Sequence, residues 1–360
     1  MNINSNITLY VVLTLLLFSI NADAEENNNH VKNGRSLMAL PVLGYTTDTG
    51  VIGGAAVLKS YNRDRKRLST IKAFTTYTKK KQFSIAFEVD HYFSGDRDRV
   101  LMTMGYVKYP TTFYGFGNNT DNDEYENYTP EYFESTFFYE RRIFQSFKIK
   151  TGLLLHSETL LKYKENGIFI SSYIPWKKGR FDAGPDFSVI WDSRDNTIAT
   201  LNGSLVQIIY RGLIFHDDGG SGNMVRFDAR KFLNPYSDVV FAFMGMAEEF
   251  RGDVPFYMLP VLGGQDRLRG YEENRFRDRS RLLFQHDFRF PLFGPFGGCI
   301  FAATGRVGPD TGSLFSGTWH SAFGSGFRWY FNKEDNLVIR LDFARGNDNN
   351  GVYIGFGEAF

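Results

Sequence analysis

Residues 83–90, Phe-Ser-Ile-Ala-Phe-Glu-Val-Asp, decide the fold. The apolar residues Phe83, Ile85, Phe87 and Val89 alternate with Ser84, Ala86, Glu88 and Asp90. A period of two places the apolar side chains on one face of a β-strand and the polar ones on the other. Carboxylates on the second face exclude the dry interior of a β-sandwich, because a buried unpaired charge is very costly. A strand between lipid and a wet lumen satisfies both faces.

The same alternation recurs along the chain. Sixteen stretches read as strands, near residues 38–46, 50–60, 68–78, 82–93, 98–108, 131–142, 146–158, 183–192, 203–213, 223–233, 237–250, 280–290, 296–306, 319–330, 335–345 and 351–360. The sequence therefore predicts an all-β fold, a 16-stranded antiparallel transmembrane β-barrel that occupies residues 38–360.

Connection lengths support the barrel and its orientation. Connections after odd-numbered strands include long ones, such as 109–130 and 251–279, whereas those after even-numbered strands are mostly tight, as at 94–97 and 143–145. The connection 193–202 is an exception. Outer-membrane barrels have long outer loops and short periplasmic turns. The pattern predicts a periplasmic N-terminus and a bacterial outer-membrane location.

Composition agrees with a membrane barrel and excludes several other classes. Aromatic residues make up 17% of the chain, including 36 Phe and 20 Tyr, which suits lipid-facing strands with aromatic girdles. The formal net charge of +1 argues against a nucleic-acid partner. Cys299 is the only cysteine, so an internal disulfide framework and a CxxC metal site are excluded.

The N-terminus is typical of a secretory signal. Tyr10 to Ile20 form an apolar core, and Ala22-Asp23-Ala24 offer a small-x-small cleavage site. Residues 1–24 are therefore predicted to be a signal peptide, although residues 1–8 contain no Lys or Arg. The alternative is a transmembrane helix, but that needs about 20 apolar residues, more than the 11 from Tyr10 to Ile20. Residues 25–37 are predicted to be a short periplasmic lead-in.

Residues 263–271, Gly-Gly-Gln-Asp-Arg-Leu-Arg-Gly-Tyr, fall in the sixth outer loop of this strand count. Three glycines and two arginines predict a loop with a required backbone path, the alternative being a solvated surface loop. The tetrad Leu268, Arg269, Gly270 and Tyr271 resembles one in the same loop of the bacterial surface antigen family, the barrels of outer-membrane protein assembly and translocation factors. The resemblance implies that the loop folds into the lumen and that Arg269 docks on the inner wall.

The docking site for Arg269 has two acidic candidates on lumen faces. Asp287 and Asp342 could each accept from the guanidinium, ideally with two hydrogen bonds. Asp287 is preferred because Asp-Phe-Arg-Phe-Pro-Leu resembles the family's acidic residue before a strand-ending proline. The alternative is that both acids only line a wet lumen.

One strand carries a candidate docking wall. Gly324, Gly326 and Arg328 share the lumen face of 319–330 and resemble the family's wall motif. The glycines are expected to leave space for a loop backbone.

Three further segments resemble the same family: a first-hairpin pattern within residues 41–54, Tyr-Gly-Phe-Gly-Asn at residues 114–118 in the third outer loop, and a stretch at an inner turn. An inner-turn motif comprises Asp192, Arg194, Asp195, Asn196 and Gly203, with Thr200 where the family usually has proline, so the turn is expected to be less rigid. Phe360, expected on an alternating last strand, resembles the C-terminal signal of outer-membrane barrels. A chance terminal aromatic residue is the alternative.

The resemblance implies a role in inserting proteins into the outer membrane or passing them across it. In that family a weak seam between the first and last strands is thought to pair with a client strand. The expected partners are outer-membrane lipid, client outer-membrane or secreted proteins, and a periplasmic partner in place of the family's periplasmic repeat domains. The alternative is a stand-alone plugged pore or structural barrel. No catalytic constellation, cofactor site or metal site is predicted, and the six histidines are scattered.

Overall fold

The computed structural model describes residues 35–47, 49–61, 69–95, 97–164, 167–168, 179–197, 199–215, 220–236, 238–332, 337–347 and 349–360. The predicted signal peptide and residues 25–34 of the predicted lead-in lie outside these ranges. The first strand begins at Arg35, so the lead-in boundary at residue 37 was wrong by three residues. Across the described residues no helix is long and apolar enough to cross a membrane.

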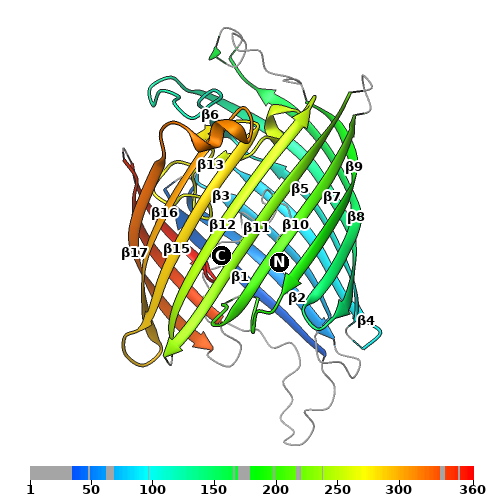
Figure 1. Cartoon of the computed structure of the whole chain (residues 1–360), viewed down its shortest axis with the longest axis vertical. Coiled ribbons are helices and arrows are strands. Elements are labelled where there is room, and N and C mark those ends of the chain that lie inside the picture. Colours follow the sequence, from blue (N-terminus) through cyan, green and yellow to red (C-terminus); the bar gives the residue numbers. More distant parts are fainter. Residues whose placement is uncertain are drawn as a thin grey trace, which may run out of the picture.

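Sixteen antiparallel strands form a closed ring in chain order, each paired with its neighbours, which confirms the predicted barrel (Figure 1). The strands are β1 (Arg35–Thr46), β2 (Gly50–Tyr61), β3 (Ser69–Thr78), β4 (Phe83–Phe93), β5 (Asp98–Lys108), β7 (Glu126–Phe144), β8 (Phe147–Lys162), β9 (Gly179–Asp192), β10 (Gly203–Phe215), β11 (Ser221–Tyr236), β12 (Val239–Gly252), β15 (Ser280–Pro291), β16 (Phe296–Gly308), β17 (His320–Asn332), β18 (Leu337–Arg345) and β19 (Asn350–Phe356).

Short elements occur in the long loops. They are β6 (Thr111–Phe113), η2 (Phe256–Met258), the paired strands β13 (Val261–Leu262) and β14 (Phe276–Arg277), and η3 (Gly312–Phe315). Figure 1 shows β6 and β13 at one rim of the barrel. We call this the outer rim, and the opposite rim, with mostly short turns, the inner rim.

The alternation sorts side chains as predicted. On β4, Ile85 and Phe87 are exposed on the outer face, whereas Ser84 and Glu88 are buried on the lumen face. Many charged groups on the lumen face of the other strands are paired, for example Arg211 with Asp186 at 2.6 Å and Arg230 with Asp228 at 2.9 Å. The barrel core is therefore a network of ion pairs and loop side chains, and the pairing lowers the cost of burying those charges.

Candidate functional site

The sixth outer loop, residues 253–279, connects β12 to β15 and contacts the lumen wall. Leu268 is fully buried in an apolar cluster with Leu262 of the loop and Leu283 of β15. Tyr271 lies in the same cluster, and its hydroxyl donates to the carbonyl oxygen of Ser321 at 3.1 Å. These contacts hold both ends of the tetrad against the barrel wall.

Gly270 brings the loop backbone closest to the wall. Its φ of 101° lies in the left-handed region that favours glycine. A Cβ there would lie 2.7 Å from the backbone nitrogen of Gly346 and 2.8 Å from the carbonyl carbon of Arg345. Its amide donates to the hydroxyl of Tyr353 on β19 at 3.0 Å. A side chain at residue 270 would therefore push the loop off the β18–β19 turn.

Arg269 lies between the two acidic candidates and pairs with both. Its side chain is 1% exposed; Nη1 donates to Asp342 Oδ2 and Nη2 to Asp287 Oδ1, each at 2.7 Å. The guanidinium carbon also lies 3.5 Å from the ring centroid of Phe301. The single bidentate partner that the sequence suggested is replaced by a bridge from β15 to β18, with cation–π contact to β16 between them.

Other arginines occupy the remaining carboxylate oxygens. Arg328 Nη1 donates to Asp342 Oδ1 at 2.6 Å, and Arg289 Nη2 donates to Asp287 Oδ2 at 3.3 Å. Arg328 Nε also donates to Glu358 Oε2 at 2.9 Å. We call Arg269, Arg289, Arg328, Asp287, Asp342 and Glu358 the docking cluster. Three arginines alternate with three carboxylates in this cluster, and Arg340, 3.5 Å from Asp342 Oδ2, links it to Asp266.

Gly324 and Gly326 make room for side chains, not for the loop backbone, so that part of the docking-wall prediction was wrong. A Cβ at Gly324 would clash with the ring of Phe301, which lies beneath Arg269. A Cβ at Gly326 would clash with the carboxylate of Asp342 and lie 2.6 Å from Nη1 of Arg328. Both glycines therefore leave space for the groups that hold Arg269.

We expect Gly326→Ala to lower the free energy of unfolding by about 1–3 kcal/mol, because the added methyl group must displace a buried ion pair. The measurement is the urea midpoint of the folded barrel, followed by the loss of heat-modifiable gel mobility. Gly53→Ala on β2 is the matched control, since its Cβ would have nothing within 4 Å. Equal midpoints for the two variants would contradict the crowding at Gly326.

The C-terminal tail folds into the lumen, which corrects the prediction that Phe360 belongs to the last strand. β19 ends at Phe356, and Gly357 follows with a φ of 77°. The ring of Phe360 lies 6.4 Å from that of Phe232 on β11, and its carbonyl oxygen accepts from Arg289 at 3.3 Å. Continued alternation would have placed Glu358 on the lipid face with Phe356 and Phe360. The inward turn instead gives that carboxylate the arginines of the docking cluster.

The inner-turn motif closes the connection from β9 to β10. Arg194 Nε donates to Asp192 at 2.9 Å. Asp195 accepts the backbone amides of Leu201 and Asn202 at 3.1 and 3.0 Å. The hydroxyl of Thr200, at the position where proline was expected, donates to the carbonyl oxygen of Asn196 at 2.6 Å. Gly203 has a φ of 114°. Side chains thus supply the bonds that hold this longer inner connection.

The third outer loop, which carries a Tyr-Gly-Phe-Gly-Asn motif at 114–118, contacts loop six and the outer end of β16. The hydroxyl of Tyr114 donates to Glu272, and that of Tyr109 donates to Glu273 at 3.0 Å. Asn118 accepts the amide of Val307 through its side chain at 3.0 Å. Only a tertiary structure could reveal these contacts, since they join residues about 160 to 190 positions apart.

The seam between β1 and β19 is poorly paired. β1 pairs with β2 along its whole length, Arg35 to Thr46, whereas the described residues show one register pair with β19, Thr46 with Tyr353. One further bond runs from the amide of Val352 to the hydroxyl of Thr47 at 3.0 Å. Most of one edge of β1 thus has no strand partner in the described part of the chain, an arrangement that strand edges usually avoid.

Two solved structures are similar to this chain. The BamA barrel of Haemophilus ducreyi, in a structure lacking POTRA domains 1–3, matches with a TM-score of 0.61 and 12% identity over 96% of this chain and 75% of that one. CdiB of Acinetobacter baumannii matches with a TM-score of 0.57 and 11% identity over 89% of this chain and 59% of that one. The chain thus spans less than two thirds of CdiB. No family model and no curated protein matches the sequence. The chain therefore has the barrel fold of BamA and CdiB, which confirms the predicted resemblance at the level of fold.

Proposed function

We propose that this barrel helps proteins insert into, or pass across, the bacterial outer membrane by pairing a client strand with the open edge of β1. The observation that carries the proposal is the seam, where a single register pair joins β1 to β19. The unpaired backbone of β1 offers amide and carbonyl groups to an incoming strand, and such β-augmentation needs no particular client sequence.

The C-terminal tail supports the same proposal. Because the chain turns inward at Gly357, the last strand has only seven residues, Asn350 to Phe356, against twelve in β1. Part of β1 therefore faces lipid without a neighbour, where unsatisfied backbone groups are costly. A client strand would satisfy those groups, and this provides a driving force for its capture.

The lumen contributes a fixed wall in this proposal and no chemistry of its own. Loop six is held inside by the docking cluster, and the third outer loop contacts it. We therefore propose a non-enzymatic role without a cofactor, in contact with lipid, client proteins and a periplasmic partner that delivers them. Low ionic conductance is expected, because the lumen is occupied by the loop.

A photocrosslinking amino acid at Leu43 tests the proposal in growing bacterial cells that express the protein. Leu43 lies on the outer face of β1, within the unpaired edge. We expect it to capture newly made outer-membrane or secreted proteins. The matched control is Leu155, exposed on the outer face of β8, whose neighbours β7 and β9 occupy both edges. Equal capture at both positions, or capture of β19 alone at Leu43, would favour a sealed pore or structural barrel.

A further inference from the structure

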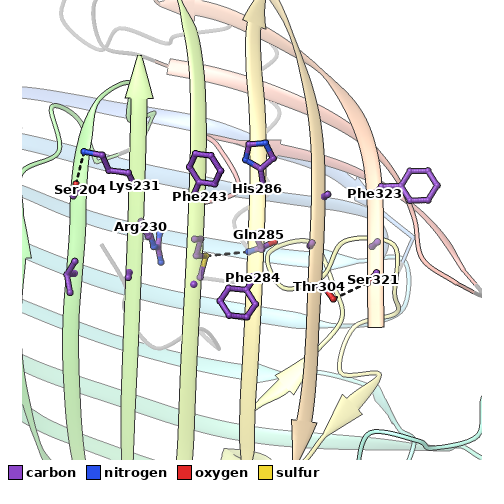
Figure 2. Close-up of a pocket in the computed structure, with 17 residues that line it drawn as sticks. Ser204, Arg230, Lys231, Phe243, Phe284, Gln285, His286, Thr304, Ser321 and Phe323 are labelled. Atoms are coloured by element: carbon purple, nitrogen blue, oxygen red, sulfur yellow. Dashed lines mark hydrogen bonds between the residues drawn. The ribbon is translucent and has the colours of Figure 1, made fainter. Parts of the chain in front are cut away.

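The outer wall carries a groove of about 860 Å³ across the strands from β10 to β17 (Figure 2). One row of outward side chains crosses the groove, residue by residue in register: Ser204, Lys231, Phe243, His286, Ala302 and Phe323. Six strands spaced by about 4.8 Å make such a row about 24 Å long. Its length and shape suit an extended, narrow occupant.

Small residues form the floor of the groove, and rings form its sides. Ala229 and Gly245 are register partners on β11 and β12, and Ala302 lies two strands further on β16. The rings of Phe243 and Phe284 stand in front of the strands in Figure 2. A wall of uniformly large side chains would leave no such trough against the bilayer.

The groove is mostly apolar, with Lys231 near its β10 end and the hydroxyls of Thr304 and Ser321 at its β16–β17 end. The Nζ of Lys231 donates to Ser204 Oγ at 3.2 Å. Ser204 is the second residue of β10, next to the inner turn, so the ammonium group points toward the inner rim. Within the described residues, no carboxylate lies within ion-pair distance of Lys231. A cation on a lipid-facing wall is costly unless it reaches the interface and finds an anionic partner there.

His286 adds a second polar group two strands from Lys231, with Phe243 between them. Its ring stacks on Phe243 with centroids 4.6 Å apart, and Nδ1 lies 3.1 Å from the carbonyl oxygen of Ala242. The ring therefore holds a fixed orientation in the row, with Nδ1 as the donor. The Lys231 ammonium group near the inner end of a mostly apolar trough matches an amphiphile with an anionic head.

We propose that the groove binds one phospholipid of the inner leaflet, with its phosphate on Lys231 and one acyl chain along the trough toward Phe323. Charge complementarity selects this occupant over a second copy of the chain. Two copies packed groove to groove would bury two Lys231 ammonium groups in an apolar interface that supplies neither with an anionic partner. The proposal concerns the outer wall and does not depend on the function of the seam.

Native mass spectrometry of the folded barrel, titrated with dioleoyl phosphatidylglycerol, tests the site. We expect one retained lipid, and about fivefold weaker binding for Lys231→Gln, the loss of one interfacial cation. Ala302→Phe should weaken binding to a similar extent by filling the trough. Dioleoylglycerol, which lacks the phosphate, should bind the wild-type barrel no better than phosphatidylglycerol binds Lys231→Gln.

The control is Lys59→Gln, which removes an exposed lysine from the outer face of β2, two residues from the inner end of that strand and away from the groove. Heat-modifiable gel mobility shows that each variant is folded. Equal weakening by Lys59→Gln and Lys231→Gln would overturn the proposal, since surface charge alone would then explain binding. A dimer that Ala302→Phe dissociates would also overturn it, because the groove would then be an interface between copies.

Discussion

Arg269→Ala is expected to lower the free energy of unfolding by about 3–5 kcal/mol, the typical cost of removing one partner from a buried charge network. Asp287 and Asp342 each lose their 2.7 Å partner; Asp287 retains Arg289, and Asp342 retains Arg328 and a longer contact to Arg340 at 3.5 Å. The three carboxylates of the docking cluster would then outnumber its arginines. The variant should show a lower urea midpoint, reduced heat-resistant mobility on gels and faster proteolysis within loop six.

Arg251→Ala separates this effect from the general loss of an arginine. Arg251 pairs with Glu249 at 3.0 Å near the outer rim, but its side chain is 70% exposed, and such surface pairs contribute little to stability. Unchanged mobility and protease resistance in Arg269→Ala would mean that the docking cluster does not hold loop six. Both variants keep the strands intact, so any difference between them reports on the loop.

The strand count could be predicted because lipid and lumen impose opposite demands on neighbouring residues. The stretch 82–93, for example, became β4, Phe83 to Phe93, with Phe87 outward and Glu88 inward. A register shift of one residue is disfavoured here, because it would expose Glu88 to lipid. Lipid and lumen constrain residues in turns and at strand ends less strongly, so strand boundaries are harder to predict. The first strand accordingly begins three residues earlier than expected.

The docking cluster could be predicted only in part. A lumen arginine needs a carboxylate, which correctly drew attention to Asp287 and Asp342. Alternation alone cannot show that one guanidinium reaches both, because β16 and β17 separate the two acids. The bridge also depends on the space left by Gly324 and Gly326. Spacing in the sequence does not encode such packing.

The C-terminal tail contains a local sequence signal for a strand break, which the prediction from alternation did not use. Val352, Ile354, Phe356 and Phe360 share one parity, which favoured a strand to the end of the chain. Glu358 has the same parity, and a carboxylate facing lipid is strongly disfavoured. Together with Gly357, it predicts a break after Phe356, which is where β19 ends. The break shortens the last strand, β19, and so leaves fewer residues to pair with β1 at the seam.

A disulfide across the seam, formed in Thr46→Cys/Tyr353→Cys, is expected to abolish client assembly if β1 must separate from β19. Directly opposed residues of an antiparallel ladder have Cα atoms about 4.5–5.5 Å apart, within the range that a disulfide spans. These two residues form the one register pair of the seam. The assay reconstitutes the variant in liposomes and measures protease-resistant folding of an added outer-membrane barrel, with the oxidised form expected at the level of empty liposomes.

The reduced form of the same variant is the matched control, because it carries the same substitutions, including the loss of the Tyr353 hydroxyl that accepts from Gly270. Reduction should restore folding of the client to the level of the wild type. If the oxidised and reduced forms assist folding equally, the seam is not the route, and a client must use the lipid around the barrel. If neither form nor the wild type exceeds empty liposomes, the structural barrel becomes the better description. The β1 edge must open only if the disulfide abolishes client folding and reduction restores it.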